Sequence, residues 1–256
     1  MVGATLQANA WVRRFHPASD AATRLVCFPH AGGSASFYFP VSRALSPEVD
    51  VLAIQYPGRQ DRRTEAPVGS IHTLADRITE DLLDWSDRPL TLFGHSMGAL
   101  LAYEVATRLE ERGVNPLGLF ASGRRAPSTY RGSEREDPGS DESLIREMKK
   151  LSGTDVEVFA NDDLLRIILP AIRGDYRAVQ TYRHRPAQPP LSCPVIALNG
   201  DDDPQVTPAE VRAWERHTSN TFRTRTFSGG HFYLNAQAPS VLAEVSSFID
   251  MATLRV

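Results

Sequence analysis

The chain has 256 residues, a formal net charge of −3 at pH 7 and a pI near 6.2, so it lacks the basic excess typical of nucleic-acid-binding proteins. Hydrophobic residues make up 41% and charged residues 23% of the composition, as in an ordinary globular protein. No apolar run is long enough to cross a bilayer, and residues 1–15 lack the pattern of a secretory signal, which argues against membrane and exported classes.

The two cysteines, Cys27 and Cys193, lie in apolar segments that are typical of strands or strand edges. Free cysteine is among the residue types most often buried, so both are expected to be reduced core residues. Together with the missing signal, this pattern predicts a cytoplasmic protein that binds neither nucleic acid nor membrane. We expect it to be a monomer.

Short apolar runs alternate with longer helical patterns, which is the signature of βα units around a mostly parallel sheet. Strands are predicted over residues 25–28, 51–55, 90–93, 117–121, 195–198 and 222–227, and helices over residues 37–45, 74–85, 99–112, 208–217 and 239–251. A further strand over residues 11–16 would add an antiparallel edge. The expected fold class is α/β, with residues 1–256 forming a single domain in which helices flank the sheet.

Residues 124–190 interrupt this alternation because they contain no good strand candidate. A polar, turn-rich segment over 128–140 is followed by helical patterns over 143–151 and 162–182, and Pro170 should kink the second helix. A helical excursion of this length between two strands is typically a lid over an active site. The alternative is a helical subdomain that only covers the sheet edge. Residues 124–190 are called the helical insertion below.

The pattern Gly94-His95-Ser96-Met97-Gly98 is the most informative in the chain. Gly-x-Ser-x-Gly is weak by itself, but here an apolar strand enters it and a helix rich in small residues leaves it, as in a nucleophile elbow. Such a turn strains the serine backbone, and a Cβ at either flanking glycine would collide with its surroundings. The helix N-terminus also favours developing negative charge. Ser96 is therefore the predicted nucleophile.

A serine hydroxyl needs a base and the base needs a carboxylate, and in this kind of fold the chain order is Ser, acid, His. Two histidines follow the helical insertion. His231 lies in a glycine-rich loop after the last predicted strand, whereas His217 ends a polar helix and is interpreted as a solvated residue that offsets the helix dipole. His231 is therefore the predicted base.

The acid is expected in the loop Asp201-Asp202-Asp203-Pro204, at the carboxyl end of a strand, where α/β folds build their sites. Successive loop residues point in different directions, so at most two of these carboxylates face His231. Asp203 is our first choice and Asp201 is the second. The alternative is a solvated acidic loop or a cation site, but no second ligand cluster supports a metal. Neither a metal nor a cofactor is expected.

The tetrahedral oxyanion of such a reaction needs two backbone N–H donors. The residue after the nucleophile, Met97, is expected to supply one, and the glycine-rich loop after an early strand the other, with Ala31 as the donor. His30 and His95 neighbour these backbone-defined turns and are interpreted as structural residues.

With these motifs assembled, the sequence resembles the type II thioesterases that accompany polyketide synthases and non-ribosomal peptide synthetases, within the α/β-hydrolase superfamily. The resemblance covers nearly the whole chain. It rests on Phe28-Pro29-His30-Ala31-Gly32-Gly33-Ser34, Gln55-Tyr56-Pro57-Gly58-Arg59, Phe93-Gly94-His95-Ser96-Met97-Gly98-Ala99, Leu169-Pro170 through Asp175-Tyr176 to Tyr182, Gly200 to Pro204, and Gly229-Gly230-His231-Phe232. It implies the triad Ser96, Asp203 and His231, the oxyanion donors Ala31 and Met97, and a mobile lid.

The resemblance also implies a substrate. The protein would hydrolyse aberrant or stalled acyl groups from the phosphopantetheine arm of an acyl or peptidyl carrier protein, which restores a blocked synthase. Three alternatives stay open: an esterase for small esters or thioesters, an acyltransferase, and a non-catalytic protein that binds acyl carriers. A non-catalytic protein should lack a member of the triad, and no member is missing from this sequence.

Arg124, Arg125 and Arg131 lie near the start of the helical insertion. Because carrier proteins are typically acidic, our hypothesis is that these three residues dock the carrier. A solvated basic loop is the alternative, since exposed charge is common.

Overall fold

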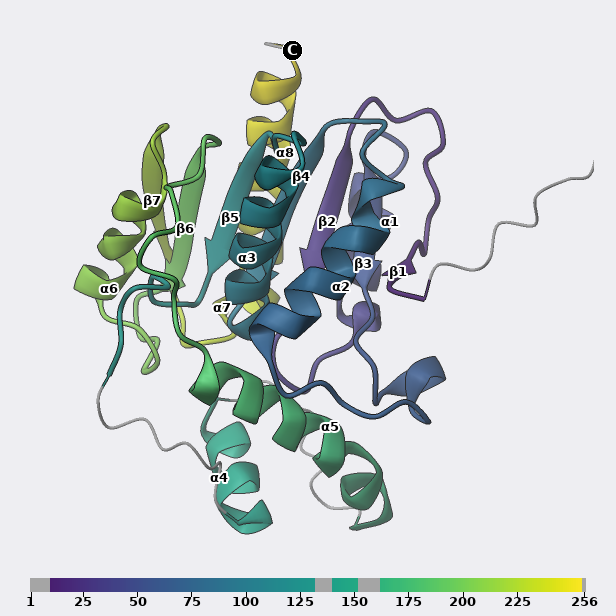
Figure 1. The fold of residues 1–256 in the computed structure, drawn as a ribbon, viewed down its shortest axis with the longest axis vertical. Coiled ribbons are helices and arrows are strands. Elements are labelled where there is room, and N and C mark those ends of the chain that lie inside the picture. The colour runs from purple at the N-terminus through teal and green to yellow at the C-terminus, as the bar shows by residue number, and fades with distance from the viewer. Residues whose placement is uncertain (1–9, 132–139, 152–161, 255–256) are drawn as a thin grey trace, which may run out of the picture.

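The computed structural model describes residues 10–131, 140–151 and 162–254, which contain a seven-stranded sheet with helices on both faces (Figure 1). The strands are β1 (Val12–Arg13), β2 (Arg24–Phe28), β3 (Asp50–Ile54), β4 (Leu90–His95), β5 (Gly118–Ser122), β6 (Val195–Gly200) and β7 (Phe222–Phe227). Their order is β1-β3-β2-β4-β5-β6-β7, and only the pair β1 and β3 is antiparallel. The predicted α/β fold class and the antiparallel edge are therefore confirmed.

Two layers of helices cover the sheet. The described helices are α1 (Phe39–Leu45), α2 (Ile71–Leu83), α3 (Met97–Glu111), α4 (Asp141–Leu151), α5 (Asp162–Thr181), α6 (Pro208–Arg212), α7 (Tyr233–Ala236) and α8 (Ala238–Thr253), with 3-10 turns η1 (Ala35–Tyr38), η2 (Gln60–Arg62) and η4 (Ala213–His217). Figure 1 shows α2 and α3 in front of the sheet and α8 behind it. The helix α2 begins at Ile71, earlier than predicted, because the Ser70 side chain accepts a hydrogen bond from Thr73 N and caps it. The short elements η2 and α7 were not predicted.

The core has two halves because successive strand residues point to opposite faces of the sheet. Val26 and Leu92 pack on the face covered by α2 and α3. Leu25, Phe93 and Ile196 pack on the face covered by η1, α1 and α8. The central strands are buried on both sides, which explains why they read as continuous apolar runs in the sequence.

The helical insertion supplies α4 and α5, which lie beyond the carboxyl edge of the parallel strands, below the sheet in Figure 1. The helix α5 runs through Pro170 without a break. A small apolar cluster of Leu144, Met148 and Ile172 joins α4 to α5. Ile172 also lies against Gly32, where an added Cβ would meet its Cγ1 at 3.2 Å. The insertion therefore contacts the loop that follows β2.

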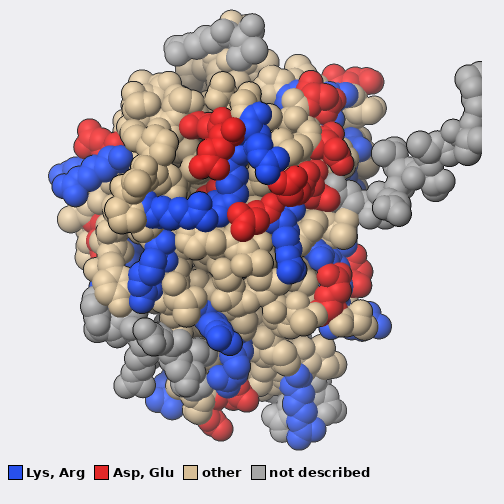
Figure 2. All heavy atoms as spheres, viewed as in Figure 1, with Lys and Arg blue, Asp and Glu red and all other residues tan. Residues whose placement is uncertain are grey.

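Charged side chains of both signs cover the front of the molecule over α2 and α3 (Figure 2). Ion pairs join these two helices: Arg108 Nε lies 2.6 Å from Asp76 Oδ1, and Arg112 Nη2 lies 2.5 Å from Glu80 Oε1. Within the described parts of the chain, no helix has the length and apolar character needed to span a membrane.

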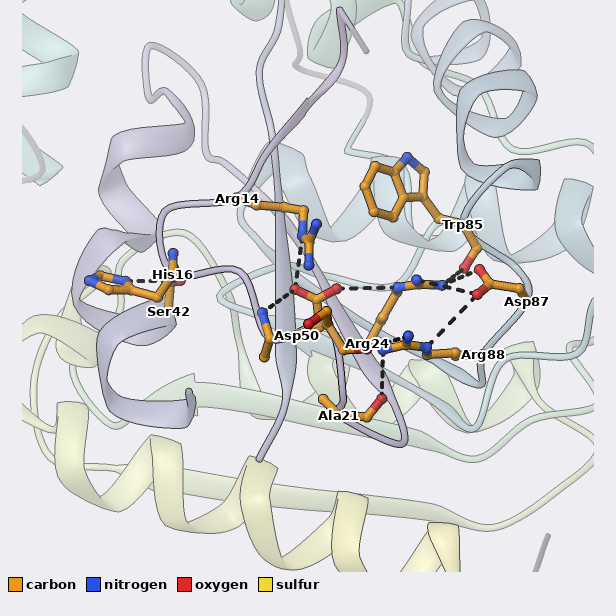
Figure 3. Close-up of polar contacts among 11 residues, drawn as sticks. Arg14, His16, Ala21, Arg24, Ser42, Asp50, Trp85, Asp87 and Arg88 are labelled. Carbon is orange, nitrogen blue, oxygen red and sulfur yellow. Dashed lines mark hydrogen bonds and ion pairs between the residues drawn. The ribbon is translucent and has the colours of Figure 1, made fainter. Parts of the chain in front are cut away.

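A buried carboxylate ties the amino ends of β2 and β3 together, at the opposite edge of the sheet from the helical insertion (Figure 3). The fully buried Asp50 side chain accepts hydrogen bonds from Arg14 Nε at 3.0 Å, Arg24 Nε at 3.4 Å and Ala18 N at 3.3 Å. Arg24 also bonds Asp87. This network anchors the end of the sheet that carries none of the predicted site residues.

Both cysteines are free and buried, as predicted from their apolar surroundings. Cys27 lies in β2, and Cys193 precedes β6.

Candidate active site

The predicted site residues follow the carboxyl ends of four strands. Ala31 follows β2, Ser96 follows β4, Asp203 follows β6 and His231 follows β7. These strands are parallel, so their carboxyl ends meet at one edge of the sheet. That edge is the usual location of a site in an open α/β sheet.

Ser96 lies in a strained turn between β4 and α3. Its φ of 55° and ψ of −116° are unusual for a residue with a side chain. A Cβ at Gly94 would lie 2.0 Å from Gly98 O, and a Cβ at Gly98 would lie 2.0 Å from Phe28 O. Both glycines are therefore required by the close approach of backbone. Ser96 N also donates to Ser122 O at 2.8 Å, which fixes the turn against the end of β5.

His231 and Asp203 form a buried pair. His231 Nδ1 lies 2.9 Å from Asp203 Oδ2, and their side chains are 2% and 0% exposed. The second oxygen, Asp203 Oδ1, accepts the N–H of Gln205 at 2.8 Å. The His231 ring lies beside Gly123, where an added Cβ would be 3.4 Å from His231 Cε1. The base and acid candidates are therefore brought together next to the strand end that holds the Ser96 turn.

The neighbouring carboxylates have other surroundings. Asp201 is exposed, and its Oδ1 accepts the N–H of Gly229 at 2.8 Å, in the loop that carries His231. Asp202 is exposed as well, and its backbone N–H donates to Gly229 O at 3.0 Å. Asp203 alone of the three contacts His231. In residues 10–131, 140–151 and 162–254 no three His, Cys, Asp or Glu side chains gather to hold a metal ion.

The backbone N–H groups of Ala31 and Met97 are both unused. Neither donates a hydrogen bond to another described residue, whereas Gly33 N donates to His30 O at 2.9 Å. Met97 is also the first residue of α3, so its N–H is one of the unpaired donors at the positive end of a long helix. Two free donors on neighbouring loops are what an oxyanion would require.

A buried ion pair that the sequence analysis missed holds the Ala31 loop. Asp175 of α5 accepts the N–H of Gly32 at 2.7 Å and bonds Arg59 through both oxygens, at 2.7 and 2.8 Å. Arg59 Nη1 in turn donates to Gly33 O at 2.9 Å. The helical insertion is therefore clamped to the loop that contains Ala31.

A signal for this clamp was present in the sequence. Asp175 follows Ala171 and Ile172 by one helical turn and precedes Ala178, and all three neighbours are buried. A lone carboxylate on the apolar face of a helix needs a partner, because an unpaired buried charge is costly. The sequence does not reveal which of the arginines supplies it.

His30 and His95 surround the base candidate and are buried, with ring centroids of His95 and His231 5.0 Å apart. Burial, helped by His231 and Arg59, lowers the pKa of His30 to about 3. Burial together with His231 and His30 holds the pKa of His95 well below its ordinary value. Both rings are therefore neutral and weakly basic near pH 7, in agreement with a structural role. His95 Nδ1 bonds Ser122 Oγ at 2.9 Å.

The interpretation of His217 as a solvated residue is wrong. Its ring is buried, with Nδ1 3.2 Å from Tyr103 Oη and Nε2 2.8 Å from Ser128 Oγ. Burial, with His184 and Arg216 nearby, lowers its pKa to about 4. The polar helix around it gave no sign of these partners, which are distant in the sequence.

The three arginines of the docking hypothesis do not form one exposed basic loop. Arg125 is buried, and Arg124 is half-buried in the wall of a cavity that opens to solvent. Arg131 is engaged by Glu210, with Arg131 Nε 2.7 Å from Glu210 Oε1. Only Arg125 is buried and Arg131 is paired, so the hypothesis that the three residues dock a carrier stays a prediction.

Comparisons with known proteins show the family of the chain. A family model described as a thioesterase domain matches residues 23–249. The chain is 51% identical to a probable cadicidin biosynthesis thioesterase of Streptomyces griseus and 48% identical to thioesterase PikA5 of Streptomyces venezuelae, covering 93% and 95% of this chain. It spans 66% and 87% of those proteins. The solved type II thioesterase BorB, from the borrelidin biosynthetic cluster, is 50% identical with a TM-score of 0.87, covering 93% of this chain and 97% of BorB.

Proposed function

This chain belongs to the thioesterase family, and we propose that it hydrolyses acyl thioesters held on the phosphopantetheine arm of a carrier protein. It is a thioester hydrolase of the α/β-hydrolase fold. Its relatives include a probable cadicidin biosynthesis thioesterase and a type II thioesterase from the borrelidin biosynthetic cluster. The substrates proposed here are aberrant or stalled acyl groups that block a polyketide synthase or a non-ribosomal peptide synthetase.

The proposed first step is acylation of Ser96. Its Oγ attacks the thioester carbonyl carbon while His231 Nε2 takes the hydroxyl proton, and Asp203 holds the protonated ring through Nδ1. The carbonyl oxygen becomes negative and accepts the N–H groups of Ala31 and Met97. Cleavage of the C–S bond then releases the pantetheine thiolate, which takes the proton from His231.

The proposed second step is hydrolysis of the acyl-serine ester. His231 removes a proton from water, and the hydroxide attacks the ester carbonyl through the same oxyanion site. Collapse of the intermediate returns the proton to Ser96 Oγ and releases the free acid. No group besides the chain's own residues and water is needed for either step.

The observation that carries this proposal is the buried 2.9 Å contact between His231 Nδ1 and Asp203 Oδ2, at the sheet edge where Ser96 lies in its strained turn. The unused N–H groups of Ala31 and Met97 support the same chemistry. A non-catalytic role would leave this arrangement without a purpose.

The helical insertion is proposed to act as a lid. Support comes from its position beyond the carboxyl edge of the sheet and from its contacts with the Ala31 loop through Asp175 and Ile172. A lid that opens for a long flexible arm suits an enzyme that removes many different acyl groups.

An esterase for small esters is the main alternative, because oxyester and thioester hydrolysis use the same groups. We would compare kcat/KM for a propionyl-loaded carrier protein and for p-nitrophenyl propionate. The proposal predicts a clear preference for the carrier. Cleavage of the small ester alone would make the protein a general esterase, and transfer of the acyl group to an added alcohol or amine rather than water would make it an acyltransferase.

A further inference from the structure

A cavity of about 530 Å³ lies beside α3, between the C-terminal end of α5, the loop after β5 and the end of η4. Its wall includes Leu100 of α3, Arg124 and Tyr130 of the loop, and Tyr182 and Arg183 after α5. The residues of the proposed triad do not contribute to its described wall. The described wall of the cavity is therefore separate from the proposed triad.

Arg124 lines this cavity without a partner for its charge. Its Nε is inaccessible to solvent and makes no hydrogen bond, and among the described residues no hydrogen bond or ion pair reaches its guanidinium. The buried arginines Arg59 and Arg108 differ from it, because Arg59 is paired with Asp175 and Arg108 with Glu104. Burial, with Arg125 and Arg131 nearby, lowers the pKa of Arg124 to about 9. Arg124 is only half-buried as a residue, but its Nε lies in the interior, and a guanidinium that enters the interior without a carboxylate is retained most readily where a ligand completes it.

The rest of the cavity reinforces the positive charge. Arg125, Arg183 and Arg216 also contribute to its wall, and no acidic side chain is among the described lining residues. Arg183 and Arg216 are exposed, so they lie where the cavity meets solvent. The nearby carboxylate of Glu210 is occupied by Arg131. In Figure 2 side chains of both signs are mixed over α2 and α3, whereas mainly basic side chains are seen between α6 and α5.

The cavity lies close to the proposed nucleophile. Leu100 is one helical turn beyond Ser96 on α3, a rise of about 6 Å at 1.5 Å per residue. Arg124 follows Ser122, whose carbonyl accepts the N–H of Ser96, by two residues. A substrate whose carbonyl is at Ser96 can therefore place a second group in this cavity.

We propose that the cavity binds an anionic oxygen group of the thioester substrate, with the Arg124 guanidinium as its central partner. The proposal rests on the proposed function, because it assigns a place for part of that substrate. The anionic group is the phosphate of the pantetheine arm or a carboxylate on the acyl chain, and either offers oxygens that match the planar fork of an arginine. The exposed arginines at the opening attract such a group from solution.

The test compares substrates that differ only in the anion. One pair is propionyl-phosphopantetheine and propionyl-pantetheine; the other is malonyl- and propionyl-N-acetylcysteamine. For the wild-type protein, we expect kcat/KM within one pair to favour the anionic member by roughly tenfold or more, as for hydrogen bonds to a charged group. In Arg124→Gln the ratio should fall toward one, and Arg124→Lys should retain part of it. Arg43→Gln, at an exposed position of α1, should keep the wild-type ratio.

The two kcat/KM ratios distinguish the phosphate of the pantetheine arm from a carboxylate on the acyl chain as the bound anion. A ratio lost only in the phosphopantetheine pair assigns the cavity to the arm, and one lost only in the malonyl pair assigns it to the acyl chain. Wild-type ratios near one in both pairs, or ratios that Arg124→Gln leaves intact, would overturn the proposal. Wild-type ratios near one would overturn the proposal even if neither Arg124 variant folds. Absence of hydrolysis for all four thioesters and for a propionyl-loaded carrier protein would instead contradict the proposed function.

The melting temperature gives an independent readout. Removing a half-buried charge that has no carboxylate partner among the described residues should leave the ligand-free stability of Arg124→Gln unchanged or increased. A marked loss of stability would mean that the guanidinium holds the fold together, and the proposal would then be wrong.

Discussion

Asp201, Asp202 and Asp203 are adjacent in the sequence, but their side chains have different environments. Asp203 is buried against His231, Asp201 holds Gly229 N, and Asp202 is exposed. The position of Asp203 in the loop favours it as the acid, but residue order alone leaves Asp201 open because it does not give the direction of the loop. Only the three-dimensional path of the loop shows which of Asp201 and Asp203 faces His231.

Replacing Asp203 should therefore impair catalysis rather than folding. Asp203→Asn keeps the shape of the side chain but cannot hold His231 in the required tautomer, and kcat should fall on the order of 10⁴-fold. Steady-state kinetics on an acyl-carrier substrate would measure this. Asp202→Asn is the matched control and should retain wild-type kcat. Equal effects of the two substitutions would contradict the assignment of the acid.

The close packing of Gly98 in the serine turn predicts that a side chain at this position would destabilise the fold. A Cβ at Gly98 would lie 2.0 Å from Phe28 O, which is backbone of a central strand and cannot move away. Gly98→Ala should lower the free energy of unfolding by more than about 3 kcal/mol, measured by urea denaturation. At Gly230 an added Cβ meets no atom closer than 3.7 Å, so Gly230→Ala should be well tolerated. A stable Gly98→Ala protein would show that the turn is looser than described.

At the scale of elements, the ion pair between Asp175 and Arg59 joins the helical insertion to the loop of Ala31. Asp175→Asn leaves the Arg59 guanidinium buried without a carboxylate, a change that costs about 3–5 kcal/mol in comparable pairs. It also weakens the anchor on Gly32 N, so kcat should fall at least about tenfold because the oxyanion donor is less well positioned.

Denaturation and kinetics of the same variant would test both effects. Glu65→Gln is the control, since Glu65 pairs with Arg62 at a half-exposed position and should matter little. If Asp175→Asn had wild-type kcat, the clamp would have no role in positioning the loop.

A second buried carboxylate, Glu104, ties α3 to α2 and to the end of α5. Burial alone would raise the pKa of Glu104, but hydrogen bonds from His72, Arg108 and Tyr182 outweigh it and lower the pKa to about 2. Because the folded pKa is below the ordinary value near 4.5, the stabilisation is complete above pH 4.5 and is lost as the pH falls toward 2. The network therefore makes the fold sensitive to acid.

Glu104→Gln should remove this sensitivity. Between pH 5 and pH 2 the free energy of unfolding of the wild type should fall by up to about 3 kcal/mol more than that of the variant, because one pKa unit corresponds to about 1.4 kcal/mol. Urea denaturation across this pH range would measure the difference. Parallel curves for the two proteins would show that Glu104 does not titrate as described.

Local sequence predicted most elements of the fold. The strand β7 was predicted with its observed bounds, Phe222–Phe227, and the helical insertion was recognised by its lack of strand candidates. The errors concern features that depend on distant residues. His217 was taken as solvated because Tyr103 and Ser128, its partners, are far away in the chain. The short helix α7 (Tyr233–Ala236) has too few residues to produce a period.

At the scale of the whole molecule, the topology brings the site together. The strands β2, β4, β6 and β7 are spread over some two hundred residues of sequence, yet their parallel pairing presents their carboxyl ends at one edge. The chain order of serine, acid and histidine could be used in advance because it belongs to this kind of fold. The cavity around Arg124 could not be predicted, since its wall combines α3, α5, the loop after β5 and η4. Such a surface exists only after folding.

The most direct test of this account follows the acyl group onto the enzyme. Wild type and Ser96→Ala would be mixed with a propionyl-loaded carrier protein, quenched at short times and weighed by intact-protein mass spectrometry, with peptide mapping of any adduct. We expect the wild type to strip the carrier and to carry a transient propionyl mass on the peptide that contains Ser96, whereas Ser96→Ala does neither. Full deacylation of the carrier by Ser96→Ala, or a propionyl mass on another residue, would contradict the central claim that Ser96 is the nucleophile.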